Sequence, residues 1–387
     1  MGHFNTIMSQ LLVHVPRHDF QNLVSRWKGD RYVKRFTTWN QLVSLFYAQA
    51  GDKHSLRDIQ SGLIAQSPKL YHLGLAGAVA KSTLSDANAT RDWRIYQGLF
   101  NLLLQRCRSL SPRHKFKFKN PLKTMDSTVI DLCLSMFPWA KFRTTKGALK
   151  LHCLLDHAGN IPSFAVVTDG KCHDVRAAKT FFNPIPDSIY CLDKGYVDFT
   201  FFRRIHDAEA FFVTRAKDNL TYTVTGQQEL PKNKAVLKDQ TIELNGFNSH
   251  KDFPFPLRLI RFYDADNDRT FEFLTNNFHL SATTIAAIYK ARWQIESFFK
   301  WIKQNLRVKT VLGTSQNAVQ TQLWIALCYF LLLAYIKFQA KYRFSLFYLH
   351  KIVRETLLER LSLIDLLGLN IAKLPKIRDK DQLCLAF

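Results

Sequence analysis

The sequence predicts an α/β protein in which a mixed sheet is preceded and followed by helical segments. Three observations predict this class. Apolar residues recur at helical spacing before residue 110, the period becomes that of strands near residue 122, and helical spacing returns after residue 281. Strand and helix patterns alternate between 122 and 214, as in an α/β layer. A chain of 387 residues can hold two or three such domains.

The N-terminal region, residues 1–110, is predicted to be helical. A helix is expected over 39–50 and ends at Gly51, and Ser55 to Asp58 forms a capping box that opens a second helix. This pair favours a plain helical hairpin over a helix-turn-helix, although its spacing is compatible with both. A further helix is expected over 93–104.

A basic linker is predicted at residues 111–121. Two prolines and five Lys or Arg residues lie between 111 and 123, which is typical of a boundary. The linker either lies along a polyanion or is simply solvated. After it, the expected strands are 122–132, 149–155, 161–168, 188–192 and 210–214, with helices at 175–182 and 199–205.

The remainder of the chain is predicted to contain a β-rich insertion and a helical end. Residues 216–275 are rich in Thr, Val, Asn, Asp and Gly and show alternating runs, whereas 281–367 is mostly helical. The run 323–336 is apolar for fourteen residues. A membrane span needs about 20, so this run is predicted to be a buried core helix, with no membrane involved.

The charge of the chain favours a polyanionic partner. Lys and Arg number 54 and Asp and Glu 31, which gives a formal charge of +23 on a chain that also holds 31 Phe residues. Such a charge on a folded, aromatic-rich protein is typical of proteins that bind nucleic acid. Seven cysteines without a C-x-x-C pair, and the absence of a signal peptide pattern, fit a reducing cytoplasm.

The most informative stretch is 289–303. On a helix, one arc of about 80° presents Tyr289, Arg292, Glu296, Lys300 and Lys303, beside an apolar stripe that can enter a core. A carboxylate among cations suits a metal ion held beside a phosphate backbone. The alternative is that Glu296 pairs with Arg292 or Lys300 on a solvated helix.

Two aspartates are the best further candidates for metal ligands. Asp126 lies within an apolar strand, where an ionised side chain is costly unless it is paired or metal-bound. Asp193 ends the apolar run 189–192, and strand ends commonly carry such ligands. Either could instead be an edge-strand charge or a turn cap. Four other carboxylates have simpler explanations: they face the other side of the strand, lie in turns or cap helices. They are Asp131, Asp156, Asp169 and Asp174.

Together these residues resemble the bacterial insertion-sequence transposases of the DDE class, most closely the insertion-sequence-four family with its Y-x2-R-x3-E-x6-K signature. Tyr289, Arg292, Glu296 and Lys303 match that signature. The segments around Asp126 and Asp193 look like the two aspartate segments of the family. The resemblance covers about 122–340, and the helical N-terminal part also looks similar.

The resemblance implies a ribonuclease-H-like catalytic domain over 122–340, with a DNA-binding helical domain at 1–110 and a helical C-terminal region at 341–387. It implies Mg²⁺, with Mn²⁺ able to substitute, held by Asp126, Asp193 and Glu296. It suggests that Tyr289, Arg292 and Lys303 contact phosphates of the DNA, and Lys300 on the same helix arc is also expected to contact DNA. The partners implied are terminal inverted repeats and target DNA, with a homodimer on DNA and a bacterial cytoplasmic, nucleoid-associated location.

The function predicted is therefore a transposase that cuts phosphodiester bonds at transposon ends and joins the 3′ ends to target DNA. The alternatives are a non-catalytic repressor derived from a transposase and a structure-selective nuclease of the same fold. Relatives that cut through a DNA hairpin use a Trp in the insertion, and residues 194–292 contain none. Phe211, Phe212, Tyr263 and Phe271 are the aromatic residues considered in its place.

Overall fold

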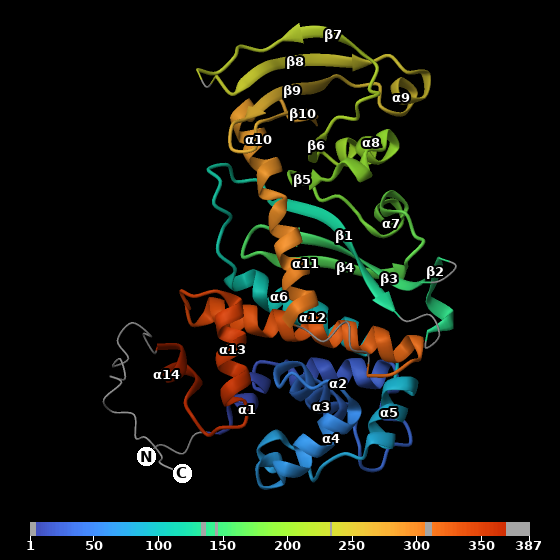
Figure 1. Ribbon diagram of the computed structural model, residues 1–387, viewed down its shortest axis with the longest axis vertical. Helices are drawn as coiled ribbons and strands as arrows, with labels where there is room; N and C mark the ends of the chain where they lie inside the picture. Colours follow the sequence, from blue (N-terminus) through green and yellow to red (C-terminus); the bar gives the residue numbers. More distant parts are fainter. Residues whose placement is uncertain (1–4, 133–136, 144–145, 233, 306–311, 369–387) are drawn as a thin grey trace, which may run out of the picture.

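The computed structural model describes residues 5–132, 137–143, 146–232, 234–305 and 312–368. Figure 1 shows an elongated molecule in which the long helix α12 (Gln316–Gln339) separates two parts. A sheet lies on one side of α12 and the helices within residues 7–90 lie on the other, while the helix Arg94–Leu110 runs alongside α12.

The N-terminal region is helical, as predicted. Thr37 and Ser55 cap two of its helices, because their hydroxyls accept hydrogen bonds from the backbone N–H groups of Asn40 and Asp58. The helices are α1 (Ile7–Leu12), α2 (Arg17–Arg26), α3 (Thr38–Ala50), α4 (Leu56–Ala65), α5 (Lys81–Thr90) and α6 (Arg94–Leu110), with a 3₁₀ segment at Ser67–Leu73.

A mixed sheet forms the other part. Its strands are β1 (Leu122–Leu132), β2 (Lys141–Arg143), β3 (Lys146–Asp156), β4 (Ile161–Asp169), β5 (Ile189–Leu192), β6 (Phe211–Arg215), β7 (Tyr222–Gln227), β8 (Val236–Leu244), β9 (Leu257–Asp264) and β10 (Arg269–Thr275). The order is β2-β3-β1-β5-β6-β10-β9-β8-β7, and β4 pairs with β3. β1, β5 and β6 are parallel, and β3 runs antiparallel to both β1 and β4.

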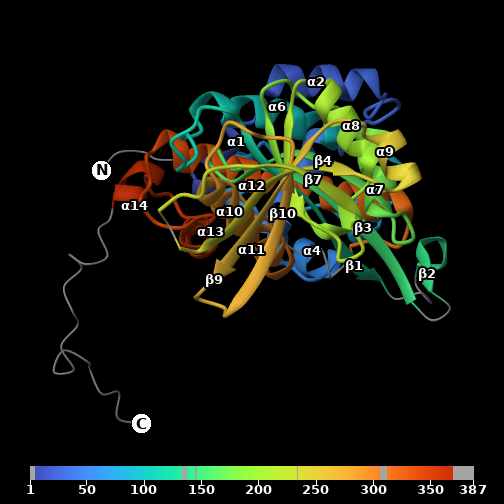
Figure 2. The same ribbon diagram turned by 90° about the horizontal axis from the view of Figure 1, so that it is seen from above.

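The β-rich insertion continues this sheet, because β10 pairs with β6 and β7–β9 follow outward. Side chains on alternate positions of the strands enter different cores. Tyr190 and Leu192 of β5 pack beneath α7 (Asp174–Phe181) and α8 (Phe199–Asp207), and α9 (Phe247–Asp252) lies against α8. Ile189 and Cys191 pack beneath α10 (Ala282–Ala291). Figure 2 shows these helices on opposite sides of the strands.

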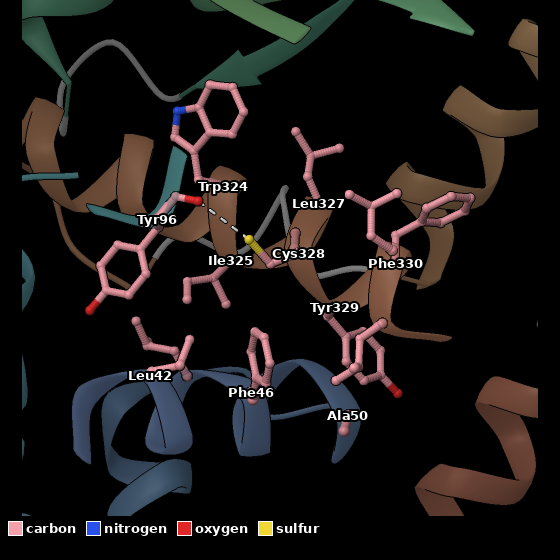
Figure 3. Close-up of a cluster of buried hydrophobic side chains, with 14 of the residues drawn as sticks. Leu42, Phe46, Ala50, Tyr96, Trp324, Ile325, Leu327, Cys328, Tyr329 and Phe330 are labelled. Carbon is pink, nitrogen blue, oxygen red and sulfur yellow. Dashed lines mark hydrogen bonds between the residues drawn. The ribbon is translucent and has the colours of Figure 1, made fainter. Parts of the chain in front are cut away.

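The C-terminal helices are α10, α11 (Trp293–Asn305), α12, α13 (Leu346–Thr356) and α14 (Leu363–Gly368). α12 is long and apolar enough to cross a membrane, but 94% of its most apolar window is buried inside the fold. Figure 3 shows Leu42, Phe46 and Ala50 of α3 and Tyr96 of α6 facing its aromatic and aliphatic side chains. The prediction of a buried core helix is therefore confirmed.

The structure differs from the sequence prediction in several places, one of which is the short helix α9 within the segment 216–275 that was predicted to be β-rich. The stretch 289–303 is two helices instead of one, with Arg292 at the junction, where the Arg292 and Ile295 amides bond three residues back. The short strand β2 and the 3₁₀ segment Pro138–Ala140 that precedes it were not predicted, since three residues are too few to show a period.

Candidate active site

Strand register brings Asp126 and Asp193 together. β1 and β5 are parallel neighbours, and Met125 lies opposite Leu192. The next residue on each strand is the aspartate, so the two carboxylates leave adjacent strands at the same level of the sheet. The backbone carbonyl of Asp193 is also within 3.5 Å of the Thr214 hydroxyl on β6, which ties the end of β5 to the sheet.

Glu296 joins them through a single guanidinium. α11 lies against β1, and Arg292 at its start extends toward the strand ends. Its Nη1 is 3.2 Å from Asp126 Oδ2, its Nη2 is 2.8 Å from Glu296 Oε1, and its Nε is 3.9 Å from Asp193 Oδ1. The three acidic residues predicted from positions 126, 193 and 296 therefore surround one side chain.

The electrostatics of Asp126 are those of a buried acid near other acids. Burial raises its pKa to about 6, and Asp193 and Glu296 contribute in the same direction. The Ser127 amide, which donates to Asp126 Oδ1 at 2.8 Å, and Arg292 oppose this rise. Burial also acts against the charged form of Arg292, but Tyr289 and the carboxylates outweigh it and raise the pKa of Arg292.

Tyr289 completes the site on the side of Asp193. Its hydroxyl lies 3.4 Å from Asp193 Oδ1, its ring packs against Phe273, and burial raises its pKa to about 12. The phenol is therefore neutral near pH 7 and able to donate a hydrogen bond to the carboxylate. Arg215, at the end of β6, lies 3.9 Å from the same carboxylate oxygen.

Lys300 and Lys303 follow on α11. Lys300 is exposed and lies four residues after Glu296, whereas Lys303 is half-buried and lies seven residues after it. Both spacings return to the side of the helix that carries Glu296. The two lysines therefore extend the charged face of α11 away from the carboxylates.

The rival carboxylates lie in other settings. Asp131 is exposed. Asp156 accepts from the Ala158 amide, and Asp169 accepts from the Lys171 and Cys172 amides, so both serve turns as predicted.

Asp174 is the first residue of α7 and its side chain does not cap the helix, so the predicted helix-capping role is wrong. Its carboxylate accepts from the Ser127 hydroxyl at 2.6 Å and lies 3.2 Å from the Lys150 ammonium and 3.5 Å from His152 Nδ1. Ser127 is the residue whose amide holds Asp126, so Asp174 braces the strand beside the site. Sequence reasoning missed Asp174 in this role, as well as Arg215. The one available signal for Arg215 was its place at the end of the strand next to β5.

The carboxylates of Asp126, Asp193 and Glu296 are chemically suited to bind a divalent metal ion. Three carboxylates supply the hard oxygen ligands that Mg²⁺ and Mn²⁺ prefer, and they outnumber the guanidinium they surround. As they stand they do not form a ready ion cage, because no group of His, Cys, Asp or Glu in the described part of the chain is arranged to hold one. Asp126 and Glu296 accept hydrogen bonds from Arg292 instead, and Asp193 lies nearer to the Tyr289 hydroxyl. Ion binding thus requires a rearrangement of these contacts.

The aromatic residues considered as substitutes for Trp differ in accessibility. Phe212 is fully buried and stacks on Phe202, so it is not available to a ligand. Phe271 is half-buried beside Phe273, and Phe211 is half-buried near His279. Tyr263 is 38% exposed and donates to Asp268, which leaves it the most accessible of the four.

The strand order β4-β3-β1-β5-β6, with three antiparallel strands followed by two parallel ones, is that of the ribonuclease-H-like class of nucleic-acid-processing enzymes. Comparison with known proteins specifies the class further. The model of the transposase DDE domain matches residues 119–332, and a model for a domain of unknown function matches 3–76. The chain belongs to the DDE transposase family.

Relatives agree with this assignment. A protein of Sinorhizobium fredii named as transposase y4zB is 34% identical over 254 residues, which are 65% of this chain and 69% of that protein. A Geobacillus stearothermophilus protein named for insertion sequence element IS5377 is 28% identical over 348 residues, 87% of this chain and 86% of its own length. The piggyBac synaptic complex with hairpin DNA aligns at TM-score 0.45 and 10% identity, over 99% of this chain and 90% of that one, which is too low to carry conclusions.

The protein is thus a DNA transposase of the insertion-sequence kind, a metal-dependent enzyme that cuts DNA and transfers strands. The predicted ribonuclease-H-like fold is confirmed, and the repressor and nuclease alternatives are not favoured. Enzymes of this family use divalent metal ions and act on DNA.

Proposed function

We propose that Asp126, Asp193 and Glu296 are the catalytic acids of this transposase and hold two Mg²⁺ ions, with Mn²⁺ able to substitute. The observation that supports this is the convergence of all three carboxylates on Arg292 from three separate elements. When bound, such ions activate water and stabilise the departing 3′ oxygen.

The residues around the carboxylates would position the DNA. Arg292 is 10% exposed and must leave at least part of its carboxylate contacts when ions bind. Its freed guanidinium would then neutralise the scissile phosphate, to which a planar fork is well matched. Tyr289 would keep Asp193 in place by donating to its carboxylate. Lys300 and Lys303 would neutralise the adjacent phosphates along α11.

The wider function follows the same proposal. The protein would bind the terminal inverted repeats of its element, hydrolyse the strands there and join the 3′ ends to target DNA. Cutting two ends together calls for a homodimer on DNA, in the cytoplasm and on the nucleoid. We assign catalysis to 122–340, DNA contact to 1–110 with a basic linker at 111–121, and a helical end to 341–387.

The direct test replaces each carboxylate. Asp126→Ala, Asp193→Ala and Glu296→Ala should each reduce Mg²⁺-dependent cleavage of end DNA by about 10³-fold or more, because each removes a metal ligand. Binding should be largely retained, as measured by electrophoretic shift with Ca²⁺. Asp131→Ala is the matched control on β1, since that carboxylate is exposed. Near-normal cleavage by any one of the three variants would remove that residue from the site.

The lysines are tested by salt dependence. Lys303→Ala and Lys300→Ala should each lower the slope of log K against log salt by about 1, because each removes a single phosphate contact. Both variants should keep the metal dependence of cleavage. An unchanged slope would contradict the assignment of that lysine to the DNA backbone.

A further inference from the structure

A basic surface lies in the N-terminal helical region, in the segment 26–35 that joins α2 to α3. Its exposed cations are Arg26, Lys28, Arg31, Lys34 and Arg35. None of these five makes an ion pair with a carboxylate among the residues that the structure describes. Five cations within ten residues therefore face solvent without a paired carboxylate, which leaves their charge available to a polyanion.

The segment borders a cleft of about 610 Å³, with residues of α5 and its C-terminal end on the opposite side. We call it the basic cleft. It is lined by Trp27, Lys28, Gly29, Arg31, Val33, Lys34, Arg35, Phe36, Thr83, Asp86, Ala87, Thr90, Arg91 and Asp92. Five of these residues are cationic and two are anionic, so its net formal charge is positive.

The internal hydrogen bonds of the basic cleft direct its charges outward. The carboxylate of Asp30, the one acid in the segment, accepts from the Thr38 amide at 2.6 Å and from the Thr38 hydroxyl at 2.7 Å. Arg91 is buried and donates to the carbonyls of Phe36 and Thr37. Asp30 therefore stabilises the start of α3, and Arg91 anchors the loop that precedes it. The remaining cations face solvent.

The alternative surface in this region is much less suited to DNA. The helix-turn-helix considered from the sequence would use α3 and α4. All residues of α3 except Asn40 are buried, and Arg57 is the one Lys or Arg on α4. A recognition helix needs an exposed face with several side chains that reach phosphates or base edges. The pair α3–α4 instead packs as a structural hairpin.

We infer that the basic cleft binds the sugar–phosphate backbone of double-stranded DNA, as a contact surface separate from the carboxylate site. This inference rests on the proposed function, because it assumes that the substrate is duplex DNA. Tyr32 is 86% exposed, and its ring and hydroxyl contact Arg31, which adds a flat polar surface suited to a sugar or phosphate. Backbone contacts position a duplex without reading its sequence.

The test removes three charges from the basic cleft of the full-length protein. The variant is Arg31→Gln/Lys34→Gln/Arg35→Gln, and its matched control is Lys341→Gln/Arg343→Gln/Lys351→Gln, which removes three exposed charges near α13. Binding to a duplex of random sequence is followed by fluorescence anisotropy over a salt series. The cleft variant should lose about 3 from the salt slope and on the order of 100-fold in affinity near 0.15 M salt. The control should stay within about threefold of wild type, because distant charges are screened.

The outcomes separate the inference from the proposed function. Equal losses of DNA affinity in the two variants, or no loss in the cleft variant, would overturn the inference. The proposed function would stand as long as the wild-type protein cleaves end DNA. A wild-type protein that does not bind duplex DNA would overturn the proposed function itself. Stronger competition by polyglutamate than by DNA would assign the cleft to an acidic protein and also overturn the inference.

A second measurement needs no variant. Lysine acetylation of the wild-type protein, read by mass spectrometry, should be slowed by DNA at Lys28 and Lys34 and unchanged at Lys341 and Lys351. Equal protection of all four lysines would contradict a specific contact at the basic cleft.

Discussion

The carboxylate site and the basic cleft use arginine in opposite ways. Arg292 is 10% exposed and contacts three carboxylates, whereas Arg26, Arg31 and Arg35 are exposed without an ion-paired carboxylate in the described part of the chain. In the first region cation and anions compensate each other in a partly buried setting, where interactions are strong and weakly screened. In the second, the charge is available to a partner and sensitive to salt. Burial and pairing, more than residue type, therefore decide what each arginine does.

Of the substitutions that test this comparison, Arg292→Ala is expected to have the largest effect on stability. It leaves three carboxylates facing one another without their cation, so the free energy of unfolding in EDTA should fall by about 2–3 kcal/mol. Urea denaturation measures this. Added Mg²⁺ should restore more stability to the variant than to wild type, because ions no longer compete with the guanidinium.

The control for that experiment is Arg215→Ala. Arg215 lies 3.9 Å from Asp193 and is 37% exposed, so its loss should cost less than about 1 kcal/mol. A variant of Arg292 as stable as wild type in EDTA would show that the guanidinium does not compensate the carboxylates.

A smaller effect is expected from Asp126→Asn as a function of pH. The pKa of Asp126 is raised from 3.8 to about 6, so the folded state binds its proton more tightly than the unfolded state. The stability linked to this group is fully present below about pH 4 and is lost as pH rises through 6. Between these pH values, wild type in EDTA should lose roughly 2 kcal/mol relative to Asp126→Asn. Parallel stability curves for the two proteins would contradict the raised pKa.

The smallest effect is expected at the basic cleft. The triple glutamine variant at positions 31, 34 and 35 should change the free energy of unfolding by no more than about 0.5 kcal/mol, because exposed charges that lack partners contribute little to the fold. Thermal denaturation without DNA checks this. A large loss of stability would mean that these side chains support the segment and would remove the contrast with Arg292.

Local sequence pattern was enough to locate most of the elements. β1 was predicted over 122–132 and occupies those residues, because the period of the sequence changes after Pro121, at the end of the basic linker. The helices at 39–50 and 199–205 were found within a residue or two, since helical spacing of apolar residues, and Gly51 at the end of the first helix, are read from neighbouring residues.

Pairing between distant residues could not be predicted in the same way. Nothing local shows that β10 pairs with β6, or that Ser127 bonds Asp174 across 47 positions. The roles of Arg215 and Asp174 depend on such pairings and were missed. The acidic residues at 126, 193 and 296 were candidates from their local sequence, and the family resemblance favoured them over their simpler explanations. The structure adds that one arginine lies within 4 Å of all three carboxylates.

The burial of α12 has a consequence for shortened copies of the gene. This helix packs against α3 and α6 and also contacts β4 and α11. A product that began near residue 111 would keep the sheet but would expose the long apolar helix α12 to water. We expect such a product to aggregate or be degraded, so that a deletion at the 5′ end of the reading frame silences the element even when every acidic side chain is retained.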